Sequence, residues 1–303
     1  AQQFTGDISG WITTDLEIME YTFAGTIKFQ SDLNSWNVTK VRNMFGIFRG
    51  SKYNQPLNGW VTSSLLTIRE AFQGNGEFNQ NLNSWSVDQV DDMRGTFNGA
   101  VSFNNGQSAG VSTTLSWNVG EVTKMARMFK ACTAFNGYLS GWNVSNVGSM
   151  QEMFASAPYG DSTWNNGASA GVSTTLSWNV ENVLNMNNMF QANSAFNANI
   201  SAWKPTALRF MRQTFKGASA FNNGFPAGSA GTATISNTLD WNMPNLSDLI
   251  DTFSAASAFN SYINNWTVAN VTSMRYMFSG ATSFNQPLDN WNVGSVGQMN
   301  YMF

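Results

Sequence analysis

The stretch that decides the fold is Phe284-Asn285-Gln286-Pro287-Leu288-Asp289-Asn290-Trp291-Asn292-Val293, closed by Val296, Met299, Met302 and Phe303. Variants of it recur along the whole chain, and one tryptophan marks each copy. These tryptophans stand at positions 11, 36, 60, 85, 117, 142, 178, 203, 241, 266 and 291, and the commonest spacing is 25 residues. Eleven copies of one unit therefore make up the chain, which is the signature of a solenoid.

Two hydrophobic periodicities coexist inside each unit. Trp36 and Val38 are two residues apart, as on one face of a short strand. Met44, Ile47 and Phe48 then follow at spacings of three and one, a pattern typical of a helix face. We predict an α/β repeat solenoid similar to a leucine-rich repeat, with eleven stacked coils. Each coil would hold a short parallel strand and a helical segment of one to two turns, and the rod would be on the order of 50 Å long.

Three units are longer than the others, although residues 1–303 are expected to form a single solenoid. The distance from the opening aromatic residue to the tryptophan doubles in the fifth and seventh units and nearly triples in the ninth. We place the insertions at about 104–114, 155–175 and 222–238. Insertions of this kind lie on one face of a solenoid, often the binding face, but tolerated growth of surface loops explains them equally well.

Two columns of residues are expected to form structural ladders between coils. The tryptophans should stack in the core, where each ring buries on the order of 150–250 Å². The residue after the opening aromatic is usually asparagine, whose amide could hydrogen-bond the turn of the next coil; a row of ligand-binding groups is the less favoured interpretation. The ladder positions are Trp36, Trp85, Trp117, Trp142, Trp178, Trp203 and Trp266, and Asn79, Asn104, Asn136, Asn197, Asn260 and Asn285.

A second asparagine column follows the tryptophan. Lying between two inward strand positions, it should point out of the sheet, so it is our candidate contact face. Its members are Asn118, Asn143, Asn179, Asn242 and Asn292, with Asn37 at the same place. Candidate glycosylation sequons begin at Asn37, Asn143, Asn199, Asn245, Asn265 and Asn270, and several of them would arise by chance in a chain this rich in Asn, Ser and Thr.

The composition excludes several functional classes. The chain has 303 residues, no histidine, 11% charged residues and a net charge of −3, so it lacks imidazole sites and the clustered cations that nucleic acid requires. The single cysteine, Cys132, is expected in the core. Apolar runs long enough to span a bilayer are absent from the sequence. With 42% hydrophobic residues, the chain is expected to fold rather than remain disordered.

Groups that could carry chemistry are scarce in the sequence. Asp91 and Asp92 form the one paired carboxylate of note, and a solvated face explains them better than acid–base catalysis. Methionines recur in pairs, as at Met125 and Met128, where core filling is favoured over a copper or haem site. We therefore expect no catalytic residue, no metal site, no cofactor and no enzymatic activity.

The repeat frame Phe284-Asn285 to Trp291, Val296, Met299 and Met302-Phe303 resembles that of BspA-type leucine-rich surface proteins, a group that includes mycoplasma-type surface repeats of about 25 residues. The likeness covers all eleven units and is loosest in the second and third, where Tyr53 replaces Phe. The resemblance implies a non-catalytic protein of the cell surface or extracellular space that adheres to cells, matrix or other surfaces. It defines no binding residue that could be carried over.

Two classes of function remain open. One is a structural subunit or fragment of a surface fibre, whose partner is another copy of itself. The other is an adhesin or recognition module that binds a protein or glycan through the outer strand face or the insertions. The units at both ends lack the polar caps usual in solenoids, which we interpret as a fragment of a longer array or as end-to-end stacking between molecules.

Overall fold

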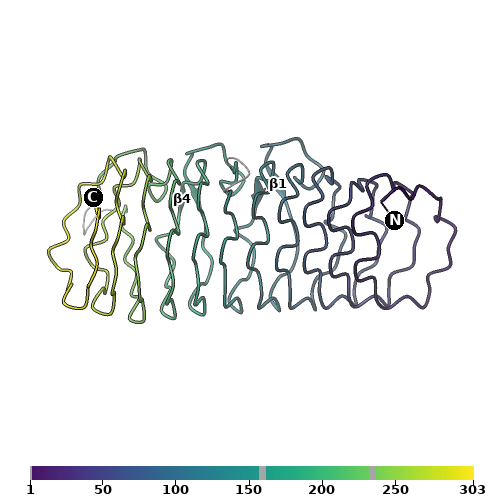
Figure 1. Cartoon of the computed structure of the whole chain (residues 1–303), viewed down its shortest axis with the longest axis horizontal. Helices are drawn as coiled ribbons and strands as arrows, with labels where there is room; N and C mark the ends of the chain where they lie inside the picture. The colour runs from purple at the N-terminus through teal and green to yellow at the C-terminus, as the bar shows by residue number, and fades with distance from the viewer. Residues whose placement is uncertain (1, 157–161, 232–236) are drawn as a thin grey trace.

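The computed structural model describes residues 2–156, 162–231 and 237–303, which form one elongated rod of stacked coils with the two chain ends at opposite ends of the rod (Figure 1). Each coil pairs with the next in parallel at one bridging residue. Within the described residues these positions are Ile18, Asn43, Thr67, Asp92, Lys124, Ser149, Asn185, Phe210, Asp248, Ser273 and Gln298. Between Asp248 and Ser273 the link is the N–H of Leu249, which donates to the Ser273 carbonyl at 2.9 Å. The rod is therefore a tandem array of eleven coils.

Regular secondary structure is sparse. The strands are β1 (Thr113–Thr114), β2 (Gly137–Tyr138), β3 (Thr174–Thr175) and β4 (Ala198–Asn199), and the parallel pairs are β1 with β2 and β3 with β4. The described residues contain no α-helix. Nothing in the described part of the chain thus has the length and apolarity of a membrane-crossing helix.

A ribbon of consecutive turns takes the place of the predicted helical segment. We call it the turn ribbon; it comprises residues 17–25, 42–50, 66–74, 91–99, 123–131, 148–156, 184–192, 209–217, 247–255, 272–280 and 297–303. Alternate N–H groups reach the next coil: those of Met44, Gly46, Phe48 and Gly50 donate to carbonyls of the following ribbon segment at 2.7–3.1 Å. Between them, the N–H groups of Ile47 and Arg49 close turns onto the carbonyl three residues earlier, and that of Phe45 donates to Oδ1 of Asn43 at 2.8 Å.

The helical segment that we predicted is therefore not confirmed, and the reason is geometric. In segment 42–50 the inward side chains stand at the third, sixth and seventh places, and the residue just after the segment is also buried, which gives intervals of three, four and seven from the first of them. Met44, Ile47, Phe48 and Ser51 are buried in this order. These are also the spacings of one helix face. The ribbon repeats every four residues because a residue with positive φ recurs at that interval, as at Gly46 (59°) and Gly50 (62°).

The strand expected at the Trp-x-Val segment is also not confirmed as a ladder. The N–H of Trp36 closes a turn onto the Leu33 carbonyl at 3.0 Å, and the N–H of Val41 closes another onto the Val38 carbonyl at 2.9 Å. Between the two turns, the N–H of Asn37 donates to the hydroxyl of Thr13 at 2.8 Å rather than to a backbone carbonyl of a neighbouring coil. The strands that do form lie just before the leucine position of the repeat unit, as β1 lies before Leu115.

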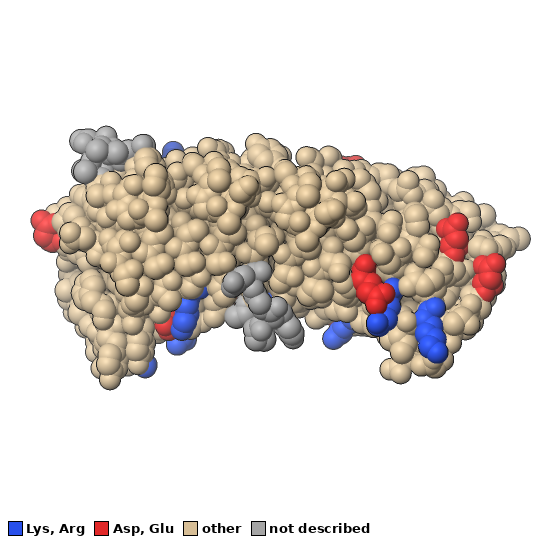
Figure 2. Space-filling model, turned by 90° about the horizontal axis from the view of Figure 1, so that it is seen from above, with Lys and Arg blue, Asp and Glu red and all other residues tan. Residues whose placement is uncertain are grey.

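Aromatic columns fill the core along the whole rod. The closing phenylalanines stack without interruption from Phe23 to Phe303, with centroids of successive rings 5.4–5.9 Å apart. Stacked tryptophans such as Trp178 and Trp203 are 5.7–6.3 Å apart. Paired backbone is spaced at only about 4.8 Å. The coils are thus closest on the turn-ribbon side, so the rod bows around it, and Figure 2 shows this bow from above.

The predicted insertions lie beside the coils that follow them. In the insertion at 104–114, the N–H of Gly110 donates to Ala134 of the next coil at 3.1 Å, and Gly171 and Gly228 make the same bond to Ala195 and Ala258. The insertion predicted at 155–175 includes residues 157–161, and that at 222–238 includes residues 232–236. Both groups lie outside the described residues.

Candidate functional site

The asparagines after the opening aromatic form an unbroken hydrogen-bonded ladder. The side-chain Oδ1 of each one accepts the backbone N–H of the asparagine in the next coil, at 2.8–3.1 Å. The ladder runs through Asn54, Asn79, Asn104, Asn136, Asn165, Asn197, Asn222, Asn260 and Asn285. Asn104, Asn136 and Asn197 are buried, so their amides are engaged in structure rather than offered to a ligand.

The same ladder holds the insertions in place. The Nδ2 of Asn104 donates to the carbonyls of Ser108 and Val111, and that of Asn136 to the carbonyl of Ala168 at 2.9 Å. Asn79, Asn197, Asn222 and Asn260 bond insertion carbonyls in the same way. Hydrogen bonds therefore hold each insertion over the ladder, and we call the held insertion a bracket. Side chains at its tip, such as Val111 and Val172, are exposed.

The tryptophan column is fixed by hydrogen bonds as well as by burial. The indole N–H of each ring donates to the carbonyl at the leucine position of the preceding coil, as Trp178 does to Leu139 at 2.9 Å. The same bond is made by Trp36, Trp60, Trp85, Trp117, Trp142, Trp203, Trp266 and Trp291. Trp241 differs: its buried Nε1 has no hydrogen-bond partner among the described residues. Trp164 stacks on Phe154 at 3.6 Å, in the opening aromatic position.

The outward asparagine column is exposed throughout but has a local structural role. Oδ1 of Asn37, Asn143 and Asn179 accepts the backbone N–H two residues later at 3.0–3.2 Å, which closes an Asx-turn. Asn118 and Asn292 make the same bond to a glycine. Asn242 stands before Met243-Pro244, and proline has no N–H to donate. The turn explains the asparagine without a binding partner, and Nδ2 of Asn118 donates to Asp88 at 2.8 Å.

The candidate sequons are mostly accessible. Asn37, Asn143, Asn245, Asn265 and Asn270 are exposed. Asn199 is half-buried in β4, and its Oδ1 accepts the N–H of Ser201 at 3.0 Å. The structure thus places five of the six on the surface.

The remaining candidates of the sequence analysis belong to the core or to ion pairs. Cys132 is buried, and burial raises the pKa of its thiol. Met125 and Met128 are buried in the core cluster. Asp92 pairs with Arg94, and Asp91 with Lys124 at 2.6 Å. The described residues contain no cluster of three carboxylate or cysteine groups that could hold a metal ion.

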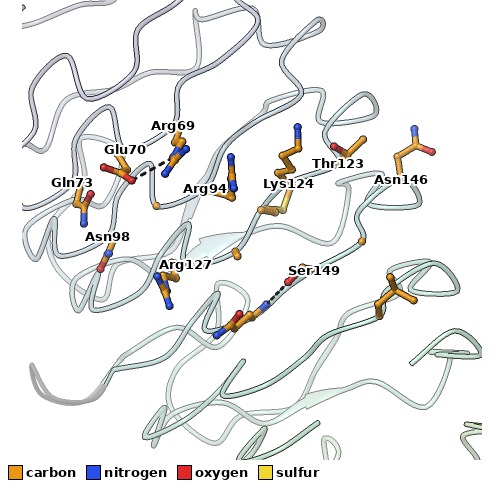
Figure 3. Close-up of a pocket in the computed structure, with 16 residues that line it drawn as sticks. Arg69, Glu70, Gln73, Arg94, Asn98, Thr123, Lys124, Arg127, Asn146 and Ser149 are labelled. Atoms are coloured by element: carbon orange, nitrogen blue, oxygen red, sulfur yellow. Dashed lines mark hydrogen bonds and ion pairs between the residues drawn. The ribbon is translucent and has the colours of Figure 1, made fainter. Parts of the chain in front are cut away.

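A hollow in the described surface lies on the turn ribbon, on a face that the sequence analysis did not single out. It is a groove of about 720 Å³ that crosses the ribbon segments 66–74, 91–99, 123–131 and 148–156. Figure 3 shows Arg69, Arg94 and Lys124, from three successive coils, in one row of side chains. The groove is lined by Arg69, Glu70, Gln73, Arg94, Gly95, Asn98, Thr123, Lys124, Met125, Ala126, Arg127, Asn146, Gly148, Ser149, Gln151 and Leu184.

Ion pairs fix the charged side chains of the groove. Glu152 accepts hydrogen bonds from Arg127 at 2.9 Å and from Lys130. Burial raises the pKa of Glu152, but these bonds and the two positive charges outweigh it, so the pKa lies below its ordinary value. Hydrogen bonds from Lys124 and Thr123 likewise lower the pKa of Asp91. The two carboxylates that pair with Arg127 and Lys124 are therefore ionised at neutral pH.

Comparison with known proteins identifies the chain by family. Residues 1–110, 51–168, 166–238 and 225–303 each match the model of one family, described as Mycoplasma protein of unknown function, DUF285. Comparison with curated proteins and with solved structures gave no significant match. Four overlapping matches to one model also agree with a tandem repeat. The chain belongs to the DUF285 family of Mycoplasma repeat proteins, whose function is unknown.

Proposed function

We propose that this chain is a non-catalytic structural and adhesive rod of the cell surface or extracellular space, forming part of a fibre or filament. The observation that carries the proposal is the Asn ladder from Asn54 to Asn285, which is one hydrogen-bonded column through the length of the rod. The phenylalanine stack from Phe23 to Phe303 runs beside it. A rod whose coils are joined by the same hydrogen bonds and ring contacts along its length suits a mechanical role.

The junctions also explain how such a rod could be lengthened. Every coil presents the same donors and acceptors to its neighbour, so a further coil would find the same partners as an internal one. That coil could come from a longer array or from a second molecule, a contact that generates filaments when it repeats without closing. The resemblance of the repeat frame to that of BspA-type leucine-rich surface proteins supports this proposal.

Electron microscopy of the native material tests the structural part. We expect fibres whose axial repeat matches the length of the rod or a multiple of it, whereas dispersed single rods would refute the filament. Labelling of intact cells with an antibody to the chain, with and without permeabilisation, tests the location. Labelling that appears only after permeabilisation would overturn a surface role.

A second candidate is a recognition module that binds a protein or glycan. It is favoured by the exposed side chains at the bracket tips, among them Gln107, Val111 and Val172, and by the outward asparagines such as Asn143. A glycan and matrix-protein binding screen should compare the chain with the variant Gln107→Ala/Val111→Ala/Val172→Ala. These changes keep the backbone bonds of the brackets. Binding that survives them unchanged would exclude the brackets as the contact.

A further inference from the structure

The turn ribbon gathers the positive charge of an acidic protein. All eight arginines of the chain lie in it, together with Lys124, Lys130 and Lys216. Eight carboxylates accompany these eleven cations, so the ribbon carries 11 − 8 = +3, whereas the whole chain carries 15 − 18 = −3. The rest of the chain therefore carries 4 − 10 = −6. In the view from above, most of the visible charged side chains lie along the hollowed edge of the rod (Figure 2).

In most ion pairs of the ribbon, the side chain of the cation is more exposed than that of its carboxylate partner. The side chain of Arg127 is 53% exposed and that of its partner Glu152 12%; for Arg94 and Asp92 the values are 42% and 14%. Arg49 with Glu70, Arg69 with Glu70, Lys130 with Glu152 and Lys216 with Asp251 follow the same order. Lys124 and Asp91 are equally accessible. A molecule approaching the ribbon therefore meets guanidinium and ammonium groups before it meets carboxylates.

Several donors of the groove are not used by the fold. Arg127 employs Nε and Nη2 on Glu152, and Arg94 employs Nε and Nη2 on Asp92, which leaves their Nη1 groups for other acceptors. Nε of Arg69 lies 3.4 Å from Glu70, an ion-pair distance without hydrogen-bond geometry, and has no hydrogen-bond partner among the described residues. Oε1 of Gln73, which is an acceptor, also has no hydrogen-bond partner among the described residues.

We propose that the turn-ribbon groove binds a linear polysaccharide that carries sulfate or carboxylate groups. The arginines meet its anions through charge-assisted, bidentate hydrogen bonds. Amide and hydroxyl groups between them, such as Asn98 and Ser149, suit the sugar hydroxyls. The groove crosses four successive coils, which matches an extended chain better than a compact ligand.

Single-stranded nucleic acid is a less suitable ligand. Its bases are held by stacking on aromatic side chains, and the described residues that line the groove include none. This inference names the partner of the adhesive rod proposed above, and so it rests on that function. It concerns a different face from the brackets and the outward asparagines.

Binding of dextran sulfate and polygalacturonate to the full chain, followed by calorimetry or surface plasmon resonance, tests the proposal. Neutral dextran is the uncharged control, and single-stranded DNA and polyphosphate are the rival polyanions. We expect both acidic polysaccharides to bind, neutral dextran not to bind, and affinity to fall as salt is raised because the groove is open to solvent. Stronger binding of DNA or polyphosphate, or equal binding of neutral dextran, would overturn the proposal.

The variant Arg69→Gln/Arg94→Gln/Arg127→Gln removes three groove cations, and Lys28→Gln/Lys40→Gln/Lys52→Gln removes the same charge elsewhere. The groove variant should weaken dextran sulfate binding by on the order of tenfold or more, and the control by less than about threefold. Equal losses of affinity in the two variants would mean that binding depends only on net charge, which would overturn the groove as the binding site. If the triple variant misfolds, Arg127→Gln alone serves, because Glu152 keeps Lys130. Absence of binding by a chain found on the cell surface would refute this inference and leave the proposed function standing.

Discussion

The Oδ1 of Asn136 accepts the backbone N–H of Asn165 at 3.0 Å, and it also accepts that of Gly167 at 3.2 Å. Its Nδ2 donates to the carbonyl of Ala168 at 2.9 Å. One buried side chain thus joins two coils and clamps a bracket. Since an asparagine repeats this role in coil after coil, the ladder predicts a measurable and position-specific contribution to stability.

Replacing Asn136 by alanine should be strongly destabilising. The change leaves the buried N–H of Asn165 and the half-buried N–H of Gly167 without their acceptor, and a buried group left so costs on the order of 1–3 kcal/mol. We expect a loss of roughly 2–5 kcal/mol in the free energy of unfolding, measured in urea. The control is Asn143→Ala in the exposed outward column, which should cost less than about 1 kcal/mol. Equal losses at the two positions would contradict the ladder.

Truncation of a core tryptophan should open a cavity between coils. Trp142 is buried, packs against Phe129 with ring centroids 6.2 Å apart and donates its indole N–H to Leu115 at 2.9 Å. Trp142→Ala is therefore expected to cost roughly 3–5 kcal/mol. Chemical denaturation followed by the fluorescence of the remaining tryptophans measures it. A loss below about 1 kcal/mol would be incompatible with a ring in the core.

The indole hydrogen bond can be separated from the packing. Trp178 donates to Leu139, whereas Nε1 of Trp241 has no partner among the described residues. Both rings are buried, so Trp178→Phe and Trp241→Phe lose similar volume. Trp178→Phe should cost about 1 kcal/mol more, because only it removes a hydrogen bond; the Leu139 carbonyl then keeps just the backbone N–H of Trp142. Paired denaturation curves give the difference, and the reverse order would show that the hydrogen bonds do not set the cost.

These columns are the part of the structure that the sequence predicts most directly. Trp36 and Asn104 recur at fixed places in the unit, and identical residues at identical places in stacked coils must lie one above another. Once the period is known, the ladder follows from the need to satisfy buried amides. The Asx-turns are harder to predict from the sequence. Asn143 and the N–H group whose hydrogen bond it accepts lie within one unit, so the repeat pattern shows only the asparagine itself.

The turn ribbon is the part of the fold for which the sequence pattern predicted a helix instead. Its inward residues, such as Met44, Ile47 and Phe48, have the spacing of a helix face, so hydrophobic periodicity alone cannot separate the two. A distinguishing signal is present in Gly46 and Gly50, which stand four residues apart and cost helix stability. The groove was missed for a related reason. Arg69 and Arg94 occupy the same place in their units and Arg127 the next one, and they meet Lys124 in one groove only when the ribbon forms.

Backbone strain in the ribbon gives a further prediction. Ala192 has a φ of 54° and Gly217, at the same place in the next coil, has a φ of 70°. A side chain in this left-handed region costs on the order of 1 kcal/mol. Ala192→Gly should therefore be neutral or stabilising, since the relief offsets the entropy of glycine. Gly217→Ala should be destabilising by about 1 kcal/mol or more, although its added Cβ would lie 3.5 Å from Ala192, an ordinary contact. Thermal melts of the two variants check the opposite signs.

The carboxyl group of Asp248 gives a prediction with a defined pH dependence. Burial raises the pKa of Asp248 above its ordinary value of 3.8, although the N–H of Ile250 and the charge of Arg212 lower it in part. Its buried Oδ1 has no hydrogen-bond partner among the described residues. The ionised form is therefore less favourable in the folded chain than in the unfolded chain. The resulting destabilisation is fully present above the folded-state pKa and disappears as the pH falls below 3.8.

Asp248→Asn removes the group that titrates. We expect the variant to gain stability relative to the original chain as the pH rises from below 3.8 to neutrality, because only the original chain then takes on a buried charge. Urea denaturation at a series of pH values gives the difference in unfolding free energy at each pH. Asp91→Asn is the matched control with the opposite sign, since hydrogen bonds from Lys124 and Thr123 lower the pKa of Asp91. Its variant should lose stability relative to the original chain over the same rise in pH. Two curves with the same slope would show that the surroundings of the two carboxylates do not differ as the structure places them.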